Sequence, residues 1–131
     1  MIQEFNRDDR DYRRFFQSRN VSLSSFNKSK SLVNERNISG KKDPITKDIN
    51  NFSLTSEQYY MHVDPALEVL ATTKFSGKHD PWIKGVIVPV VWKKYYGEGR
   101  VFYNSIGHSI ENFEIPEVWE MTKRGIVWAC K

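Results

Sequence analysis

The stretch GVIVPVVWKKYYGEGRVFYNSIGH, residues 85–108, decides the fold class. Its first part, residues 85–92, is a continuous apolar run of the kind that forms a strand buried on both faces. Pro89 within this run cannot donate a hydrogen bond to a neighbouring strand, so we expect it at a sheet edge or a β-bulge. Gly97 and Gly99 then link the run to a second β-prone stretch, and both glycines are free to take positive φ. The pattern predicts a β-hairpin.

Outward from the hairpin, the sequence predicts further strands and a closing helix. EVLATTKF, residues 68–75, is typical of a strand, and so is SEQYYMHVDP, residues 56–65, which ends at an Asp-Pro pair. EIPEVWEMTKRGIVWACK, residues 114–131, predicts a helix with Pro116 at its first position. Its apolar stripe includes Gly125, which lowers helix propensity and so indicates close packing on the sheet. The expected architecture is strand-rich, with a helix laid over a sheet.

The strand expected at residues 56–65 has two different faces, because side chains alternate along a strand. The odd-numbered residues share one face: Glu57, Tyr59, Met61 and Val63. The even-numbered residues share the other: Gln58, Tyr60, His62 and Asp64. The second face is polar throughout, which suits either solvent or the wall of a polar pocket.

The composition is that of an ordinary globular protein. The chain has 131 residues, of which 39% are hydrophobic and 27% are charged, and this length is typical of one domain. No run reaches 18 apolar residues and the N-terminus lacks an apolar signal segment, so we expect no membrane span and a cytoplasmic setting. The single cysteine, Cys130, cannot form an internal disulfide. Its place in an apolar helix predicts an inert, packed thiol.

The net charge of +4 comes from the N-terminal third of the chain. Residues 1–42 carry ten Lys and Arg against five Asp and Glu, whereas residues 43–131 carry ten against eleven. Residues 1–37 are rich in Ser, Arg and Asn, begin with a short amphipathic helical pattern, and are expected to form a flexible leader. Three aspartates lie among the arginines and would repel phosphates, so we expect no nucleic-acid binding.

The histidines are the main candidates for chemistry. His108 ends a strand directly after a glycine, where a side chain can project into a crevice at the edge of a sheet. His62 lies on the polar strand face beside Tyr60, and a structural, hydrogen-bonded role suits it equally well. His79 lies in a turn-like loop and is expected to be solvated. These histidines and Asp64 lack the spacing of known metal motifs, so we expect no metal. No P-loop, GxSxG or dinucleotide fingerprint occurs, and no cofactor is expected.

Three stretches together resemble the trehalose-utilisation (ThuA-like) family: residues 43–73, 81–108 and 124–129. The resemblance covers about residues 38–131. One departure is Asp43, because the family pattern has a histidine before this proline. The resemblance implies a class I glutamine-amidotransferase-like, flavodoxin-like α/β fold. Residues 38–131 would then be the C-terminal part of such a domain, with a sheet, a hairpin and a C-terminal helix.

The resemblance also implies a function, because the family is linked to the catabolism of disaccharides, above all trehalose. In related amidotransferases a strand-end histidine serves a cysteine nucleophile. His108 occupies the comparable strand end, but no such cysteine is present, so glutaminase activity is not expected. We expect catalytic roles for His108 and His62. The expected substrate-binding residues are Tyr59, Tyr60, Trp92 and Tyr103, and the expected partner is a small-molecule sugar.

The alternative is a truncated, non-catalytic fragment. Family members begin with parallel βαβ units that residues 1–37 do not resemble, so a pocket between the two halves would lose one wall. Such a chain would act at most as an interaction module. Its uncovered sheet face would promote self-association. The sequence leaves open which sugar is bound, which reaction is catalysed and what the oligomeric state is.

Overall fold

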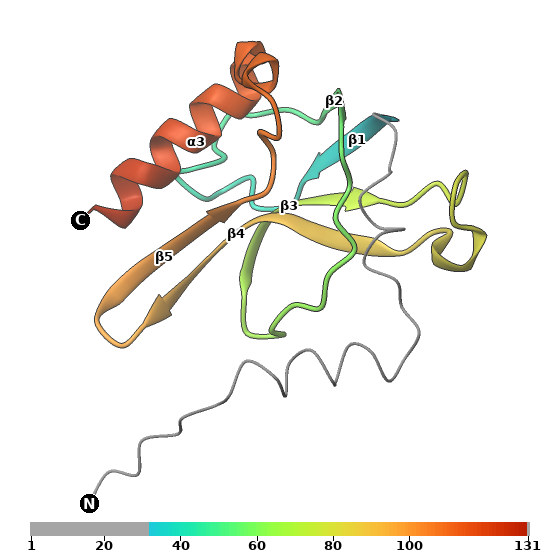
Figure 1. The fold of residues 1–131 in the computed structure, drawn as a ribbon. Coiled ribbons are helices and arrows are strands. Elements are labelled where there is room, and N and C mark those ends of the chain that lie inside the picture. Colours follow the sequence, from blue (N-terminus) through green and yellow to red (C-terminus); the bar gives the residue numbers. More distant parts are fainter. Residues whose placement is uncertain (1–31, 131) are drawn as a thin grey trace, which may run out of the picture.

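The computed structural model describes residues 32–130, which form one curled sheet with a helix on one face (Figure 1). The strand order is β2-β1-β3-β4-β5, and every neighbouring pair is antiparallel. The strands are β1 (Leu32–Ile38), β2 (Phe52–Ser56), β3 (Glu68–Lys74), β4 (Ile87–Tyr96) and β5 (Gly99–Asn104). The helices are the 3-10 helices η1 (Pro81–Ile83) and η2 (Ile110–Glu114) and the α-helix α3 (Pro116–Ala129). The predicted combination of sheet, hairpin and C-terminal helix is confirmed, whereas the amidotransferase-like class stays a prediction.

The predicted hairpin is formed by β4 and β5. The two strands pair from Val91 opposite Asn104 to Tyr96 opposite Gly99, which leaves a two-residue turn. Gly97 opens this turn with a φ of 58°, a conformation that favours glycine. Gly99, which is equally free to take positive φ, does not do so, because it already lies in the extended strand.

Pro89 lies at a bulge, as predicted. Thr72 of β3 lies opposite Pro89, but the adjacent Ala71 lies opposite Val91, so Val90 is left over in the register. The pairing with β5 begins only at Val91, which means that no ladder hydrogen bond from residue 89 is needed on that side. The predicted burial of residues 85–92 holds for the three valines of β4, whereas Ile87 remains 60% exposed.

The helix α3 packs its predicted apolar stripe against the sheet. Pro116 occupies the first helical turn, and Val118 and Met121 are fully buried. Gly125 faces the ring of Phe102 on β5 so closely that a Cβ at this position would overlap the ring. The prediction that this glycine permits close helix–sheet packing is therefore confirmed.

An ion cluster around the nearly buried Lys93 joins the loop after β1 to the helix-covered face of the sheet. Lys93 Nζ lies 2.5 Å from Asp43 Oδ2, 3.4 Å from Glu68 Oε2 and 5.0 Å from the centroid of the Trp128 ring. Burial lowers the pKa of Lys93, but the hydrogen bonds and charges of Asp43 and Glu68 outweigh this effect and raise the pKa above its ordinary value. Asp43, the departure from the family pattern, thus serves as an ion-pair partner in the core.

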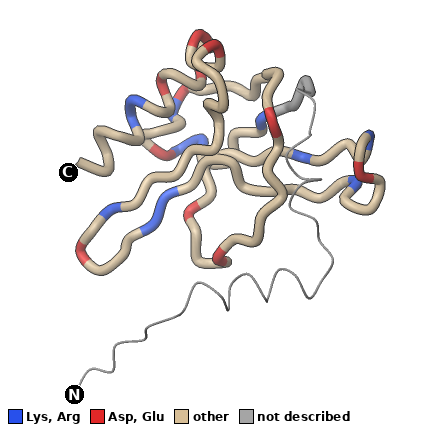
Figure 2. Tube along the Cα trace, in the orientation of Figure 1, with Lys and Arg blue, Asp and Glu red and all other residues tan. Residues whose placement is uncertain are grey.

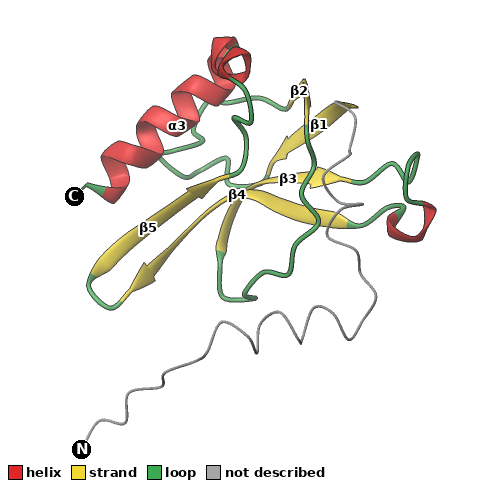
Figure 3. Cartoon of the chain, in the orientation of Figure 1, coloured by secondary structure: helices red, strands yellow, loops and turns green. Residues whose placement is uncertain are grey.

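The strand predicted at residues 56–65 is wrong. β2 ends at Ser56, and the following residues 57–64 are drawn as a loop that crosses the sheet (Figure 3). We call these residues the bridging segment. Register explains the difference: Ser56 pairs with Leu32, the first residue of β1, so the described ladder has no further partner to offer. Aromatic and β-prone residues indicate side-chain packing as much as ladder pairing, and here the side chains pack on the sheet without a ladder, so they are only partly buried or exposed.

The predicted leader falls largely outside the described residues. The amphipathic pattern near the N-terminus and the candidate nucleic-acid contacts lie in residues 1–31, outside the described chain. β1 begins at Leu32, so residues 32–37 of the predicted leader belong to the sheet.

Charged residues are spread over the described part of the chain. Figure 2 shows basic and acidic positions interspersed along the strands, the helix and the loops. This distribution agrees with the balanced charge of residues 43–131. Among the helices of residues 32–130, none has the length and apolar character that a membrane crossing requires.

Candidate functional site

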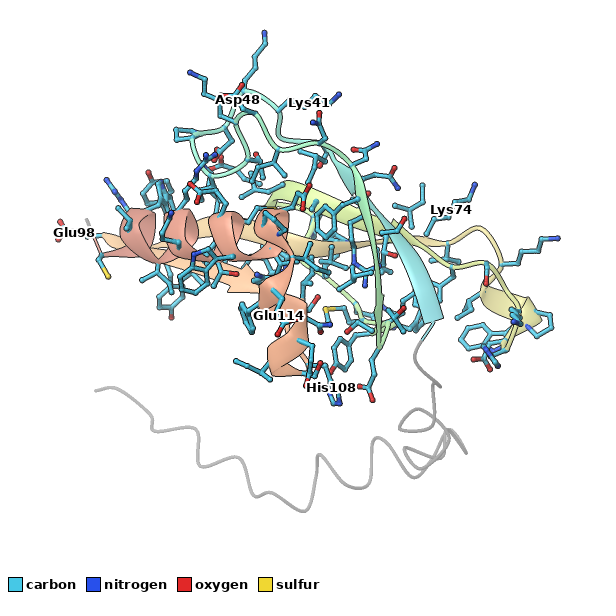
Figure 4. The ribbon with its side chains drawn as sticks, turned by 90° about the horizontal axis from the view of Figure 1, so that it is seen from above. Lys41, Asp48, Lys74, Glu98, His108 and Glu114 are labelled. Carbon is cyan, nitrogen blue, oxygen red and sulfur yellow. The ribbon has the colours of Figure 1, made fainter. Side chains whose placement is uncertain are left out.

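The topology brings residues 57 and 108 together at one end of the sheet. Because neighbouring strands alternate in direction, β2, β3 and β5 run the same way and their carboxyl ends share an edge. Glu57 directly follows β2 and His108 follows β5 after three residues. The Nδ1 atom of His108 lies 3.5 Å from Oε2 of Glu57, and the imidazole is 55% exposed. The result is a carboxylate–imidazole pair at the surface, with His108 labelled in Figure 4.

The turn that carries His108 is anchored to the end of β2. Gly107 has a φ of 137°, and the ring of Phe113 covers the position where a side chain would project. Asn112 of η2 is 6% exposed and accepts a hydrogen bond of 3.2 Å from the hydroxyl of Ser56. Since Ser56 directly precedes Glu57, the same contact holds both members of the pair in place.

Glu57 also binds a tyrosine on its own segment. Burial, a hydrogen bond to Glu57, the charge of Glu57 and the nearby Tyr103 together raise the pKa of Tyr59. The phenol therefore keeps its proton and donates a hydrogen bond to the Glu57 carboxylate. Glu57 is thus placed between Tyr59 and His108, and it orients both.

A stacked aromatic pair lies beside these groups. Trp92 of β4 and Tyr103 of β5 are opposite each other in the ladder, with ring centroids 4.7 Å apart and planes only 13° from parallel. The Tyr103 hydroxyl donates to the sulfur of Met61 at 3.9 Å, which ties the bridging segment to the hairpin. The indole N–H of Trp92 is buried, with no partner among the described residues. We call this site the His108 cluster; its members are Glu57, Tyr59, Met61, Trp92, Tyr103 and His108.

The other two predicted site residues, Tyr60 and His62, lie in a different group. Tyr60 contacts Phe75 with ring centroids 6.0 Å apart, Trp82 at 5.3 Å and His62 at 6.3 Å, each edge to face. Figure 4 shows His108 well separated from Lys74, the residue that ends β3 just before Phe75. The structure therefore brings Tyr59, Trp92, Tyr103 and His108 together, and assigns Tyr60 and His62 to a second group, which we call the Trp82 cluster.

Alternation along the bridging segment separates the two clusters. The odd-numbered Tyr59 and Met61 belong to the His108 cluster, whereas the side chains of the even-numbered Gln58 and Tyr60 point to the opposite side. Gln58 donates a hydrogen bond of 2.7 Å to the hydroxyl of Thr73. The period-2 pattern was visible in the sequence, although the segment is not a ladder strand.

Sequence reasoning missed Glu57 and Trp82 as candidate site residues. The signal for Glu57 was present, because it shares the odd-numbered face with Tyr59. The polar even-numbered face was the one predicted as a pocket wall. No sequence signal distinguished Trp82 from a core tryptophan, yet it is 67% exposed.

The sequence also predicted how exposed Cys130 and His79 are. Cys130 is exposed rather than packed, because it lies one residue beyond the end of α3 and off its buried stripe. His79 is exposed in its loop, as predicted. Between residues 32 and 130, no group of three His, Cys, Asp or Glu side chains is arranged to hold a metal ion.

Comparison with protein-family models identifies the family of the chain. The family model ThuA, described as trehalose utilisation, matches residues 8–129. The chain belongs to the ThuA family. The resemblance predicted from the sequence is confirmed, and the match begins well before residue 38, where that resemblance started. Family membership supports a role in trehalose utilisation and carbohydrate metabolism. Neither the curated proteins nor the solved structures gave a match.

Proposed function

We propose that this ThuA-family chain binds a disaccharide of the trehalose type at the His108 cluster and transfers a proton to or from it. The observation that carries the proposal is the Glu57–His108 pair, 3.5 Å apart, next to the stacked rings of Trp92 and Tyr103. Carbohydrate sites combine aromatic surfaces, which contact the C–H faces of a sugar ring, with a few oriented polar groups. Both components are present here.

Each residue has a role in this proposal. Glu57 Oε2 lies 3.5 Å from Nδ1 of His108 and so orients the imidazole with Nε2 directed away from the carboxylate. Nε2 then serves as general acid or base toward a sugar oxygen. Tyr59, which is 40% exposed, offers the ring that a sugar can contact. The Trp92–Tyr103 pair supports this surface from the sheet.

The test is isothermal titration calorimetry, in which the full chain is titrated with trehalose and, separately, with an oxidised disaccharide. His108→Ala is expected to weaken binding by about tenfold or more, and Glu57→Gln to weaken it less, because the amide still accepts a hydrogen bond. His79→Ala is the matched control, since His79 is exposed in a loop outside the cluster. Circular dichroism verifies that each variant is folded. Equal affinity of His108→Ala and the parent chain would refute the assignment.

A second candidate function is that of an interaction module. It is favoured by the outer face of α3, where Trp119, Ile126 and Val127 are each more than half exposed. Large apolar side chains gathered on one helix face are typical of surfaces that associate. In this case copies of the chain self-associate, and light scattering shows a molar mass that rises with concentration. A constant monomer mass up to high concentration excludes this candidate.

The flavodoxin-like, amidotransferase-like class belongs to the same proposal. It is supported by family membership alone, because the strand pairs described between residues 32 and 130 are all antiparallel. A crystal structure of the full chain tests this class: parallel strands beside β1–β5 would support it, and an entirely antiparallel sheet would refute it.

A further inference from the structure

The loop between β3 and β4 presents a large aromatic side chain to solvent. Trp82 lies in η1 and is 67% exposed, while its neighbour Ile83 is 4% exposed and anchors the turn. Two backbone hydrogen bonds of 2.9 Å, from Phe75 N–H to the Val86 carbonyl and from Gly85 N–H to the Phe75 carbonyl, close the base of the loop. The indole is therefore exposed on a well-anchored turn.

The Trp82 side chain is also supported from one side. The Tyr60 ring meets it edge to face at 5.3 Å, with planes 72° apart, and Tyr60 in turn packs against Phe75, which is 9% exposed. Phe75 belongs to a small apolar cluster with Ile83 and Val88. A tryptophan held in this way loses little conformational freedom when a ligand binds to its open surface, which favours recognition.

Polar side chains border this aromatic surface. His62 lies 6.3 Å from Tyr60, measured between ring centroids, and is exposed. Asp80 and Lys84, the residues that flank η1, are exposed as well. An aromatic surface bordered by hydrogen-bonding groups matches a pyranose ring, which has apolar C–H faces and hydroxyl groups around its edge.

We propose that Trp82, Tyr60 and His62 form a second sugar-binding site, which holds one pyranose ring of a disaccharide. The choice of ligand rests on the proposed function, but the site itself does not include the His108 cluster. Trp82 provides the stacking surface, Tyr60 fixes the indole, and His62 hydrogen-bonds a ring hydroxyl. Tyr60 and His62, predicted as site residues from the sequence, thereby acquire a role distinct from that of His108.

The experiment follows the indole N–H signals of the four tryptophans by nitrogen-15 NMR of the full chain. Trp→Phe variants assign the signals, and trehalose is the probe, with sorbitol as a non-cyclic polyol control. We expect a saturable shift of the Trp82 signal with trehalose and none with sorbitol. His62→Ala and Tyr60→Leu are each expected to weaken the affinity for trehalose, measured from the Trp82 shift, by about tenfold. In Tyr60→Leu the leucine keeps the apolar contact with the small cluster. Trp119→Ala, which removes an exposed tryptophan from α3, is the control and is expected to change nothing.

The outcomes separate this inference from the proposed function. The indole signal of Trp92 reports on the His108 cluster, and the indole signal of Trp82 reports on the second site. If trehalose shifts the Trp92 signal and not the Trp82 signal, the second site is refuted and the proposed function stands. If only the Trp82 signal shifts, the second site is supported and the proposed function fails. Shifts at both clusters support both proposals, and shifts at neither refute both.

Discussion

Replacing Gly125 with alanine tests how closely α3 packs on the sheet. An added Cβ would lie no more than 2.5 Å from three carbon atoms of the Phe102 ring, whereas ordinary contacts begin at 3.4 Å. The helix, the ring or both must therefore move by about 1 Å. Neither can move freely, because Val118 and Met121 on the same helix face are fully buried.

Two opposing effects set the magnitude. Alanine is a better helix former than glycine by about 1 kcal/mol in a helix interior. Overpacking a tight core costs about 1–3 kcal/mol, and three close contacts with a rigid ring favour the upper end of that range. We therefore expect Gly125→Ala to lower the free energy of unfolding by about 2 kcal/mol. In an exposed helix the same change would raise it, so the sign of the effect is informative.

The assay is urea unfolding of the full chain, followed by tryptophan fluorescence and far-ultraviolet circular dichroism. Val127→Ala, at a position 53% exposed on α3, reports helix propensity without core packing. Phe102→Leu in the Gly125→Ala background should recover about 1–2 kcal/mol of the free energy of unfolding relative to the sum of the single changes, because leucine is smaller than the phenyl ring that the added methyl group would overlap. If Gly125→Ala is as stable as the parent chain or more stable, the argument from close packing is refuted.

Three further predictions concern the ion cluster and the supports of the two sites. Asp43→Asn should lower the free energy of unfolding by about 3 kcal/mol, since it leaves the buried Lys93 ammonium poorly paired. Because the pKa of Lys93 is raised, the ion pair of Lys93 with Asp43 stabilises the fold at neutral pH. The difference in free energy of unfolding between the parent chain and Asp43→Asn should shrink as the pH rises above about 10.5 and Lys93 loses its charge. The Thr73 hydroxyl accepts hydrogen bonds from the buried Arg36 and from Gln58, so Thr73→Val should cost about 1–3 kcal/mol, whereas Thr73→Ser should retain most of the stability; equal urea midpoints for Val and Ser would contradict this. Gly107→Ala, forced into a left-handed conformation, should weaken trehalose binding several-fold in calorimetry, and unchanged affinity would show that the turn tolerates a side chain.

The parts of the fold that sequence predicted correctly are those fixed by local chemistry. The hairpin follows from Gly97 between two β-prone runs, and the bulge follows from the missing N–H of Pro89. The helix follows from its 3.6-residue apolar period and from Pro116 at its start. Each of these signals acts within a few residues, so no knowledge of distant neighbours is needed.

The bridging segment shows where local reasoning stops. Alternating aromatic residues predicted a strand, but a strand also needs a partner with free backbone groups, and the register of β1 decides whether one exists. That register depends on contacts between segments far apart in the chain. The predicted alternation of side chains is still present, because odd- and even-numbered side chains contact different groups on the sheet.

The candidate site was predicted only in part, again because some of its contacts join segments far apart in the chain. His108, Tyr59, Trp92 and Tyr103 were expected together and do lie together. Tyr60 was grouped with them although it is the direct neighbour of Tyr59, and successive side chains in an extended segment point to opposite sides. The pairing of His108 with Glu57 depends on the common direction of β2 and β5, which no local pattern reveals.

The bridging segment limits which changes in chain length this protein can tolerate. Backbone ladder bonds do not hold residues 57–63 within the described chain, so their place is set by side chains that alternate between two clusters. Losing or gaining one residue there would exchange the odd and even positions and send Tyr59 and Tyr60 to the wrong sides. Substitutions can accumulate singly in this segment, whereas length changes that preserve both clusters must come in pairs of residues.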